Sequence, residues 1–355
     1  MNKRIVFTGG GSAGHVTVNL ALIPHFLEAG WEVAYIGSEN GIERELVQGQ
    51  PGVRYVAISS GKLRRYLDWK NVTDPLRVTR GAWQAYRFLK RWKPAVIFSK
   101  GGFVSVPVVL GGWMNGLPVV LHESDLTPGL ANRLSVPFAK KVCVTFAETM
   151  DHLPVEKAVH VGAVIRSELF LGSRERGLSL CGFSPSRPVL LVMGGSLGAK
   201  RINEAVRSQL TTLLADYQIV HICGKGQCDE TLQRPGYRQY EYAMEELPDL
   251  LAMADMVVSR AGSNAIFEFL ALRKPMSLIP LSKAASRGDQ IVNARAFEKR
   301  GFCEVLLEEE LTEQTFMGAL QSLAANREQI VRRMGENSQA DAMAKVIALL
   351  EQASG

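Results

Sequence analysis

The stretch IVFTGGGSAGHVTVNLAL, from Ile5 to Leu22, contains a short apolar strand, a glycine turn and then an amphipathic helix pattern. The same design returns in VLLVMGGSLGAKRINEAV, from Val189 to Val206. Such a turn lets the backbone approach a ligand closely and points free helix N–H groups at it, which suits phosphate. One copy predicts a nucleotide-fold domain. Two copies predict two such domains that face each other across a cleft.

The length, composition and charge of the chain indicate a soluble protein of two domains. Its 355 residues are enough for two cores, and 46% of them are hydrophobic. The net charge of +6 suits a phosphorylated ligand, an anionic membrane surface or nucleic acid. Five scattered cysteines, without a CxxC pair or zinc spacing, are typical of reduced cytosolic thiols. The longest apolar stretch, Val104 to Leu121, is broken by glycine and proline and predicts a helix and a strand, not a bilayer span.

Apolar strands alternate with helical patterns along both halves of the chain, which predicts an α/β protein with two parallel sheets covered on both faces. We expect an N-terminal domain over residues 1–162, a C-terminal domain over residues 163–340, and a last helix over residues 341–355 that could pack on either domain, including back on the first. The expected strands are Arg4–Thr8, Glu32–Ile36, Val53–Ile58, Ala95–Ser99, Val119–His122, Lys141–Val144, Val189–Met193, Gln218–Cys223, Tyr237–Tyr240, Met256–Ser259, Met276–Ile279 and Cys303–Leu306.

The first glycine loop has two interpretations. Gly9, Gly11 and Gly14 match the GxGxxG fingerprint of dinucleotide-binding domains, and Glu39 lies near the acidic position that such a domain needs. A single dinucleotide site leaves the second glycine turn unexplained, so we disfavour a dehydrogenase. His15 follows at once, where a helix N-terminus is expected to lower its pKa and keep a neutral imidazole available as a general base. The alternative for His15 is a helix-capping role without chemistry.

Two further strand–turn–helix segments carry candidate binding residues. In SKGGFVSVP, Gly101 and Gly102 could frame an acceptor phosphate with help from Lys100, or could simply form a tight turn. In MVVSRAGSNAIFEFLAL, the polar residues Ser263 and Asn264 begin a helix. Glu268 lies further along the same helix. Its carboxylate could accept two hydrogen bonds from the vicinal hydroxyls of a ribose, or could lie on a solvated helix face.

The segment between Lys62 and Lys93 is strongly basic. Ten Lys and Arg residues there face only Asp68 and Asp74, and leucine and aromatic residues are interleaved with them. This pattern fits a surface that docks on anionic lipid headgroups. Nucleic acid is the other interpretation, but no nucleic-acid-binding motif accompanies the segment, so we expect no nucleic acid partner.

Taken together, these motifs resemble the MurG family of peptidoglycan N-acetylglucosaminyltransferases, in glycosyltransferase family 28, over essentially the whole chain. The loops TGGGSAGH, SKGGFVSVP and MGGSLGA are similar in sequence and order to three glycine loops of the family. LHESDLTPGLANR, RAGSNAIFE and GDQIVNA are similar to three more family motifs. The chain departs from the family pattern at Ser12, Ala13, Ser124, Asp125 and Asp289.

The resemblance implies a glycosyltransferase B fold that transfers N-acetylglucosamine from UDP-N-acetylglucosamine, with inversion, to the C4 hydroxyl of the N-acetylmuramic acid of lipid I, forming lipid II for peptidoglycan. It implies no tightly bound cofactor and no metal. Its other partners would be an anionic membrane surface, at the cytoplasmic face of the cell membrane, and cell-wall synthesis proteins. The donor-binding residues that it implies are Ser12, Ala13, Gly14, Arg166, Ser196, Met244, Ser263, Asn264, Glu268 and Gln290.

On the acceptor side, the prediction comprises Lys100, Gly101, Gly102, Glu123 and Asp125. His15 is the first candidate for the catalytic base, and Glu123 or Asp125 are the alternatives. Three other functions stay open: a UDP-N-acetylglucosamine 2-epimerase, a glucosyltransferase acting on a diacylglycerol lipid, and a non-catalytic UDP-sugar-binding subunit.

Overall fold

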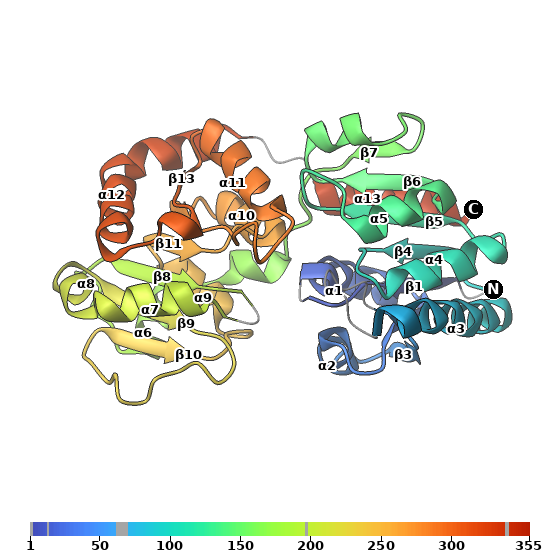
Figure 1. The fold of residues 1–355 in the computed structure, drawn as a ribbon, viewed down its shortest axis with the longest axis horizontal. Coiled ribbons are helices and arrows are strands. Elements are labelled where there is room, and N and C mark those ends of the chain that lie inside the picture. Colours follow the sequence, from blue (N-terminus) through green and yellow to red (C-terminus); the bar gives the residue numbers. More distant parts are fainter. Residues whose placement is uncertain (1–2, 13, 62–69, 196–197, 338–340) are drawn as a thin grey trace. The chain divides into compact units, whose positions relative to one another are not determined.

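A computed structural model describes residues 3–12, 14–61, 70–195, 198–337 and 341–355, and gives the backbone alone for residues 70–75. The chain divides into two units (Figure 1). Unit 1 comprises Met1–Val164 and Ala340–Gly355, and unit 2 comprises Ile165–Gln339. Each unit is a parallel sheet with helices on both faces, so the α/β fold expected from the alternating patterns is confirmed.

The sheet of unit 1 has seven strands among the described residues, in the order β3-β2-β1-β4-β5-β6-β7, and they are paired in parallel. The central strands are buried along almost their whole length, and most of their residues are apolar, because helices cover both of their faces. The strands are β1 (Arg4–Thr8), β2 (Glu32–Ser38), β3 (Val53–Ile58), β4 (Val96–Ser99), β5 (Val119–Glu123), β6 (Lys141–Val144) and β7 (Ala158–His160).

Two hydrophobic cores lie on the two faces of this sheet. One contains side chains of α1 and of the C-terminal helix α13, whose Val346 and Leu350 pack with Phe98 and Val120 of the sheet. The other contains side chains of α3 and α4. The helices of unit 1 are α1 (Gly14–Glu28), α2 (Ile42–Gln48), α3 (Lys70–Trp92), α4 (Ser105–Met114), α5 (Leu130–Ser135) and α13 (Ala342–Ser354), with short 3-10 helices at Val136–Phe138 and Ala147–His152.

Unit 2 has six described strands in the order β10-β9-β8-β11-β12-β13, again in parallel. Its strands are β8 (Val189–Met193), β9 (Gln218–Ile222), β10 (Tyr237–Tyr240), β11 (Met256–Ser259), β12 (Met276–Leu278) and β13 (Cys303–Val305). Its helices are α6 (Arg174–Cys181), α7 (Lys200–Ser208), α8 (Leu210–Asp216), α9 (Leu247–Met253), α10 (Ser263–Ala271), α11 (Asp289–Lys299) and α12 (Glu313–Glu336), with 3-10 helices at Ser167–Leu171 and Glu308–Glu310.

Both sheets reverse their direction of growth at one place. In unit 1 the chain adds β2 and β3 on one side of β1 and then crosses to the other side to add β4. In unit 2 it adds β9 and β10 on one side of β8 before crossing to β11. Ligands of open parallel sheets bind at the carboxyl ends of the strands that flank such a switch point. The fold therefore points to the loops after β1 and β4 in unit 1, and after β8 and β11 in unit 2.

Candidate active site

The two glycine loops of unit 1 lie against each other at the carboxyl ends of β1 and β4. The backbone N–H of Gly10 donates to the carbonyl oxygen of Gly101 at 3.3 Å, and the N–H of Lys100 donates to that of Thr8 at 2.9 Å. A Cβ added at Gly102 would lie only 2.1 Å from the Gly10 oxygen. The structure thus brings the predicted glycine turns of TGGGSAGH and SKGGFVSVP into direct contact. Ala13 of the first loop lies outside the described residues.

Because of this contact between the loops, we expect a side chain at Gly102 to be strongly destabilising. Its φ is +83°, which disfavours any L side chain, and its missing side chain leaves room for Gly10. We expect Gly102→Ala to lower the free energy of unfolding by about 2–4 kcal/mol in urea, since backbone strain and overpacking add. Gly116→Ala is the matched control, because Gly116 has φ +68° but open space around it, and about 1 kcal/mol is expected there. Equal decreases in the free energy of unfolding for the two variants would show that the contact between Gly102 and Gly10 does not contribute to stability.

His15 lies in the first turn of α1 and is half-buried. Its Nδ1 is 3.0 Å from the carbonyl oxygen of Gly10 and 3.2 Å from Oγ of Ser12. Because a carbonyl oxygen can only accept a hydrogen bond, Nδ1 carries the proton in the neutral ring, and Nε2 carries the lone pair. The first loop therefore fixes the tautomer in which Nε2 can accept a proton.

Lys100 and Glu123 are both buried at the same edge of the sheet. Nζ of Lys100 donates to Oγ of Ser124 at 2.7 Å. Burial lowers the pKa of the Lys100 ammonium, while the carboxylates of Glu123 and Asp125 act in the opposite direction. The buried Lys100 side chain, next to Gly101 in the chain, is thus anchored on the loop that follows β5.

The carboxylate of Glu123 is engaged by its own chain. It accepts hydrogen bonds from the backbone N–H of Asp125 at 3.0 Å and of Gly129 at 2.8 Å, and from the side-chain amide of Asn132 at 2.9 Å. Burial raises the pKa of Glu123, with a further contribution from Asp125, and Lys100 opposes both. Glu123 therefore fixes the loop that follows β5. Asn132 was not among the residues predicted from the sequence.

In unit 2 the structure joins two predicted residues that are far apart in sequence. The guanidinium of Arg166 donates from Nε and Nη2 to the two carboxylate oxygens of Glu268, at 2.9 and 3.1 Å. Glu268 lies in α10 and is only 7% exposed, and burial raises its pKa while Arg166 opposes this. A carboxylate has about four acceptor positions, and Arg166 uses two of them. Glu268 can still accept further hydrogen bonds.

The other predicted residues of unit 2 lie in four places along the chain. Ser263 is buried at the start of α10, directly after β11, and Asn264 beside it is half-buried. Oε1 of Gln290, in α11, accepts the backbone N–H of Leu281 at 3.1 Å. Met244 follows the outermost strand, β10, and is 64% exposed. Ser196 lies outside the described residues, after Gly194 and Gly195 at the end of β8.

One buried carboxylate at the first loop was missed by the sequence reasoning. Glu43, in α2, accepts hydrogen bonds from the backbone N–H groups of Gly11 and Ser38. In the sequence it is one of two acids in a short helix, and its i,i+4 spacing to the buried Val47 is too weak a signal, over seven residues, to predict a buried carboxylate. Only the course of the chain from β2 into α2 turns it toward the loop.

Two features are absent from the described part of the chain. None of the helices in these ranges is both long enough and apolar enough to cross a membrane. No group of three or more His, Cys, Asp or Glu residues in the same ranges is arranged to hold a metal ion.

Comparison with known proteins covers both units. Residues 5–144 match the glycosyltransferase family 28 N-terminal domain, and residues 189–350 match the glycosyltransferase family 28 C-terminal domain. A Geobacillus thermodenitrificans protein is 58% identical over 352 residues, which are 99% of this chain and 99% of its own length. It is named UDP-N-acetylglucosamine–N-acetylmuramyl-(pentapeptide) pyrophosphoryl-undecaprenol N-acetylglucosamine transferase. A Bacillus cereus protein of the same name with the suffix 2 is 55% identical over 99% of this chain and 100% of its own.

Solved structures share the fold. The crystal structure of the MurG of Acinetobacter baumannii has a TM-score of 0.76 at 23% identity, and covers 99% of this chain and 100% of its own. The glycotransferase of kitacinnamycin has a TM-score of 0.74 at 16% identity, with both chains fully covered. At these identities the likeness concerns the fold alone.

Proposed function

The chain belongs to glycosyltransferase family 28, and we propose that it transfers N-acetylglucosamine from UDP-N-acetylglucosamine to N-acetylmuramyl-(pentapeptide) pyrophosphoryl-undecaprenol, which converts lipid I to lipid II. The observation that carries this proposal is the 58% identity, over 99% of both chains, to a protein named as that transferase. The two glycine-loop sites, each at the switch point of a parallel sheet, are consistent with two phosphorylated substrates.

We place the donor on unit 2. The start of α10, with Ser263 and Asn264, offers backbone N–H groups to the diphosphate, and Ser196 would approach it from the loop after β8. The remaining acceptor positions of the Glu268 carboxylate suit the two ribose hydroxyls, with Arg166 holding the carboxylate in place. The amide N–H groups of Gln290 would donate to the sugar, and the backbone of Met244, an exposed residue, would contact the uracil.

We place the catalytic base on unit 1. In the proposed step, the C4 hydroxyl oxygen of the acceptor forms a bond to C1 of the donor sugar, on the face opposite UDP. Its proton passes to Nε2 of His15, and the electron pair of the breaking C1–O bond leaves with UDP. Nδ1 keeps its own proton because it donates a hydrogen bond to the carbonyl oxygen of Gly10. Following the resemblance, we also assign Ser12, Ala13 and Gly14 contacts with the donor sugar and diphosphate.

The acceptor is proposed to bind at the loops after β4 and β5. The buried ammonium of Lys100 makes the Gly101–Gly102 turn attractive to the diphosphate of the acceptor. Glu123 is a poorer candidate for the base than His15, because its two oxygens already accept three N–H groups. We assign Glu123 the role of holding Asp125 and the loop around it at the acceptor.

The test of this function is whether UDP release depends on both substrates. We expect rapid UDP release from UDP-N-acetylglucosamine only when a lipid I analogue is present. Turnover of the free UDP-sugar without an acceptor would indicate an epimerase, and turnover with diacylglycerol would indicate a glycolipid synthase. Binding without turnover would indicate a non-catalytic subunit.

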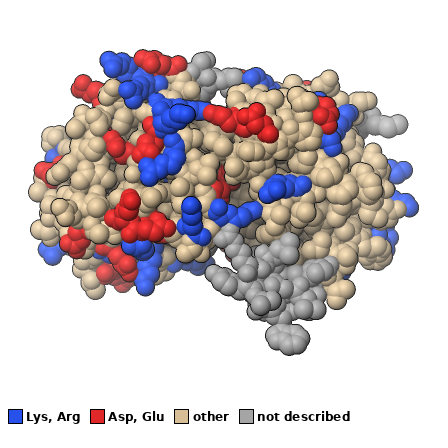
Figure 2. Space-filling model, turned by 45° about the horizontal axis from the view of Figure 1, so that its top comes forward, with Lys and Arg blue, Asp and Glu red and all other residues tan. Residues whose placement is uncertain are grey.

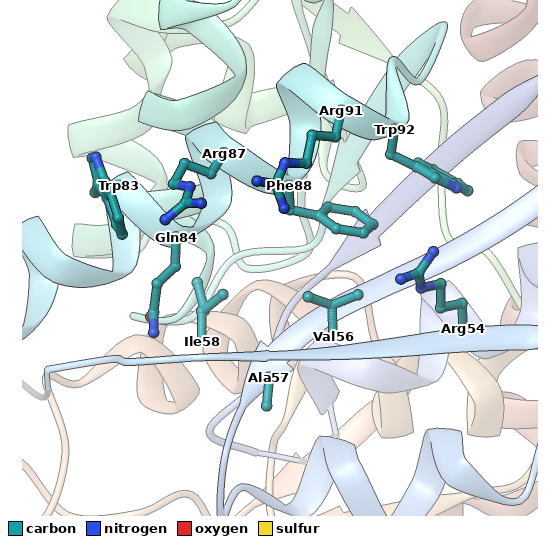
Figure 3. A pocket seen from close by; sticks show the side chains of 10 residues that line it. All are labelled: Arg54, Val56, Ala57, Ile58, Trp83, Gln84, Arg87, Phe88, Arg91 and Trp92. Atoms are coloured by element: carbon teal, nitrogen blue, oxygen red, sulfur yellow. The ribbon is translucent and has the colours of Figure 1, made fainter.

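We also propose that unit 1 docks on the anionic cytoplasmic face of the cell membrane, through a pocket of about 560 Å³ between β3 and α3 (Figure 3). Arg87 stacks on Trp83 at 4.5 Å, and Arg54 stacks on Phe88 at 5.4 Å. The side chains of α3 point toward β3 in Figure 3, and Arg91 lies at the same pocket. These arginines form no salt bridge with a carboxylate of the described residues.

The composition of this pocket suits phospholipid better than nucleic acid. Trp83 is 57% exposed, and the half-buried Val56 and Trp92 add apolar surface that could meet acyl chains beneath the charged headgroups. On the part of unit 2 that faces the viewer in Figure 2, by contrast, acidic and basic side chains are intermingled. The basic residues of the earlier segment that fall at positions 62–69 lie outside the described residues, and those at 70–75 are described by backbone alone.

Charge reversal at the pocket tests the membrane proposal. We expect Arg87→Glu with Arg91→Glu to lower binding to phosphatidylglycerol vesicles by at least about tenfold, since each basic residue at an anionic surface contributes roughly 1 kcal/mol. Co-sedimentation at low salt measures this, with neutral phosphatidylcholine vesicles for comparison. Lys345→Glu, an exposed position of α13 in the same unit, is the control and should bind normally. Unchanged binding of the double variant would refute the proposed surface.

A further inference from the structure

Glu43 is fully buried at 0% exposure, although it is a carboxylate in a short helix next to the first glycine loop. Its Oε2 accepts the backbone N–H of Gly11 at 3.2 Å. Its Oε1 accepts the backbone N–H of Ser38 at 3.0 Å and the hydroxyl of the same residue at 2.5 Å. One carboxylate oxygen is therefore anchored at the end of β2, and the other holds the first loop.

The loop is also packed directly on this carboxylate. A Cβ added at Gly10 would lie 2.4 Å from Cδ of Glu43, and one added at Gly41 would lie 2.3 Å from it. Real Cβ contacts do not approach this closely, so the carboxyl group of Glu43 fills the side-chain space of both glycines. Gly10 and Gly11 thus take their positions from Glu43 by contact as well as by a hydrogen bond.

The same loop orients the imidazole of His15. The carbonyl oxygen of Gly10 accepts Nδ1 of His15 at 3.0 Å, so any shift of Gly10 moves the group that fixes the ring. A second buried group supports the loop from below, because the hydroxyl of Tyr35 donates to the carbonyl oxygen of Gly9 at 2.8 Å. Glu43, unlike Tyr35, contacts both Gly10 and Gly11, the two residues joined by the peptide group whose carbonyl oxygen accepts the hydrogen bond from His15.

From this geometry we propose that Glu43 is a positioning residue of the transfer reaction: it holds Gly10 and Gly11 so that the Gly10 carbonyl keeps His15 in its productive orientation. Glu43 itself touches no reacting atom. The proposal rests on the proposed function, since it gives His15 the role of base.

Glu43→Gln breaks the loop contact selectively. The amide oxygen of glutamine can replace Oε1, which accepts two hydrogen bonds from Ser38. The amide NH2 then faces the N–H of Gly11, and two donors oppose each other. Size and shape are preserved, so the change acts on the position of the loop more than on the volume of the core.

We expect Glu43→Gln to lower kcat by on the order of 10- to 100-fold, because small misplacements of a catalytic group have effects of that size. The affinity for UDP should stay within about threefold, since the uracil and the ribose are assigned to unit 2. Tyr55→Phe is the matched control. It removes the 2.7 Å hydrogen bond from the Tyr55 hydroxyl to the Ser38 carbonyl, beside Glu43, without touching the loop, and kcat should stay near wild type.

A double-mutant cycle with His15→Ala separates positioning from a general effect on stability. If Glu43 acts through His15, then Glu43→Gln costs 10- to 100-fold in the wild-type background but less than about twofold when His15 is already alanine. An equal loss in both backgrounds, or a near-normal kcat for Glu43→Gln, would overturn the proposal. Failure of the proposed function is seen separately, as a wild-type enzyme that transfers no sugar.

Discussion

Replacing His15 with alanine should lower kcat by about 100-fold or more, while the affinity for UDP changes by less than about threefold. General base catalysis increases reaction rates by roughly 10²–10⁴-fold, and alanine removes the side chain to which we assign the role of base. Nδ1 of His15 is held by the Gly10 carbonyl, so the proton-accepting atom that is lost is Nε2. Steady-state rates with a lipid I analogue, together with calorimetric titration of UDP, measure both quantities.

The control for this experiment lies on the same helix. His25 is half-buried in the last turn of α1 and packs edge-on against Phe26, far along the helix from the first loop. His25→Ala should keep kcat within about threefold. A near-normal rate for His15→Ala would remove the base assignment and would direct attention to Asp125, the remaining alternative, because the Glu123 carboxylate already accepts hydrogen bonds from its own loop.

The second large effect is expected at Glu268. Glu268→Ala should raise the Kd for UDP-N-acetylglucosamine by roughly 10- to 100-fold, because hydrogen bonds to a charged group contribute about 1.5–3 kcal/mol and the variant also leaves the Arg166 guanidinium without its partner. At saturating donor, kcat should remain within about fivefold of wild type, since the ribose is remote from the reacting carbon. Calorimetric titration of the donor and full kinetics test the two statements.

Asp249→Ala provides a matched comparison in unit 2. Asp249 also accepts two hydrogen bonds from an arginine, Arg176, but that ion pair joins α9 to α6 at an exposed guanidinium. Its loss should leave donor affinity near wild type. An unchanged Kd for Glu268→Ala, or an equal change for both variants, would contradict the ribose assignment.

The fold could be predicted because it depends on local signals. The apolar runs at Ile5–Thr8 and Val189–Met193 lead straight into glycines, and such patterns specify strand and turn without distant contacts. The motifs shared with the family then assigned a function to each loop. The predicted family and fold are both confirmed. The assignments of individual site residues remain predictions.

What could not be predicted depends on contacts between distant segments. The ion pair between Arg166 and Glu268 joins residues 102 positions apart, and nothing in either local sequence specifies the partner of the other. The apolar stripe of α13 indicates that it packs, but only the folded chain shows that it covers the sheet of unit 1. Glu43 is the clearest case, because it is buried against Gly10, Gly11 and Ser38, and its own short helix does not specify these contacts.

The most direct test of the proposed transferase activity is the structure of its product. The protein would be incubated with UDP-N-acetylglucosamine and a lipid I analogue, and the acceptor would then be examined by mass spectrometry and by NMR of its new anomeric proton. We expect an acceptor that carries one added N-acetylhexosamine, β-linked at the C4 hydroxyl, with one UDP formed for each. An acceptor of unchanged mass, alongside hydrolysed or epimerised UDP-sugar, would contradict it.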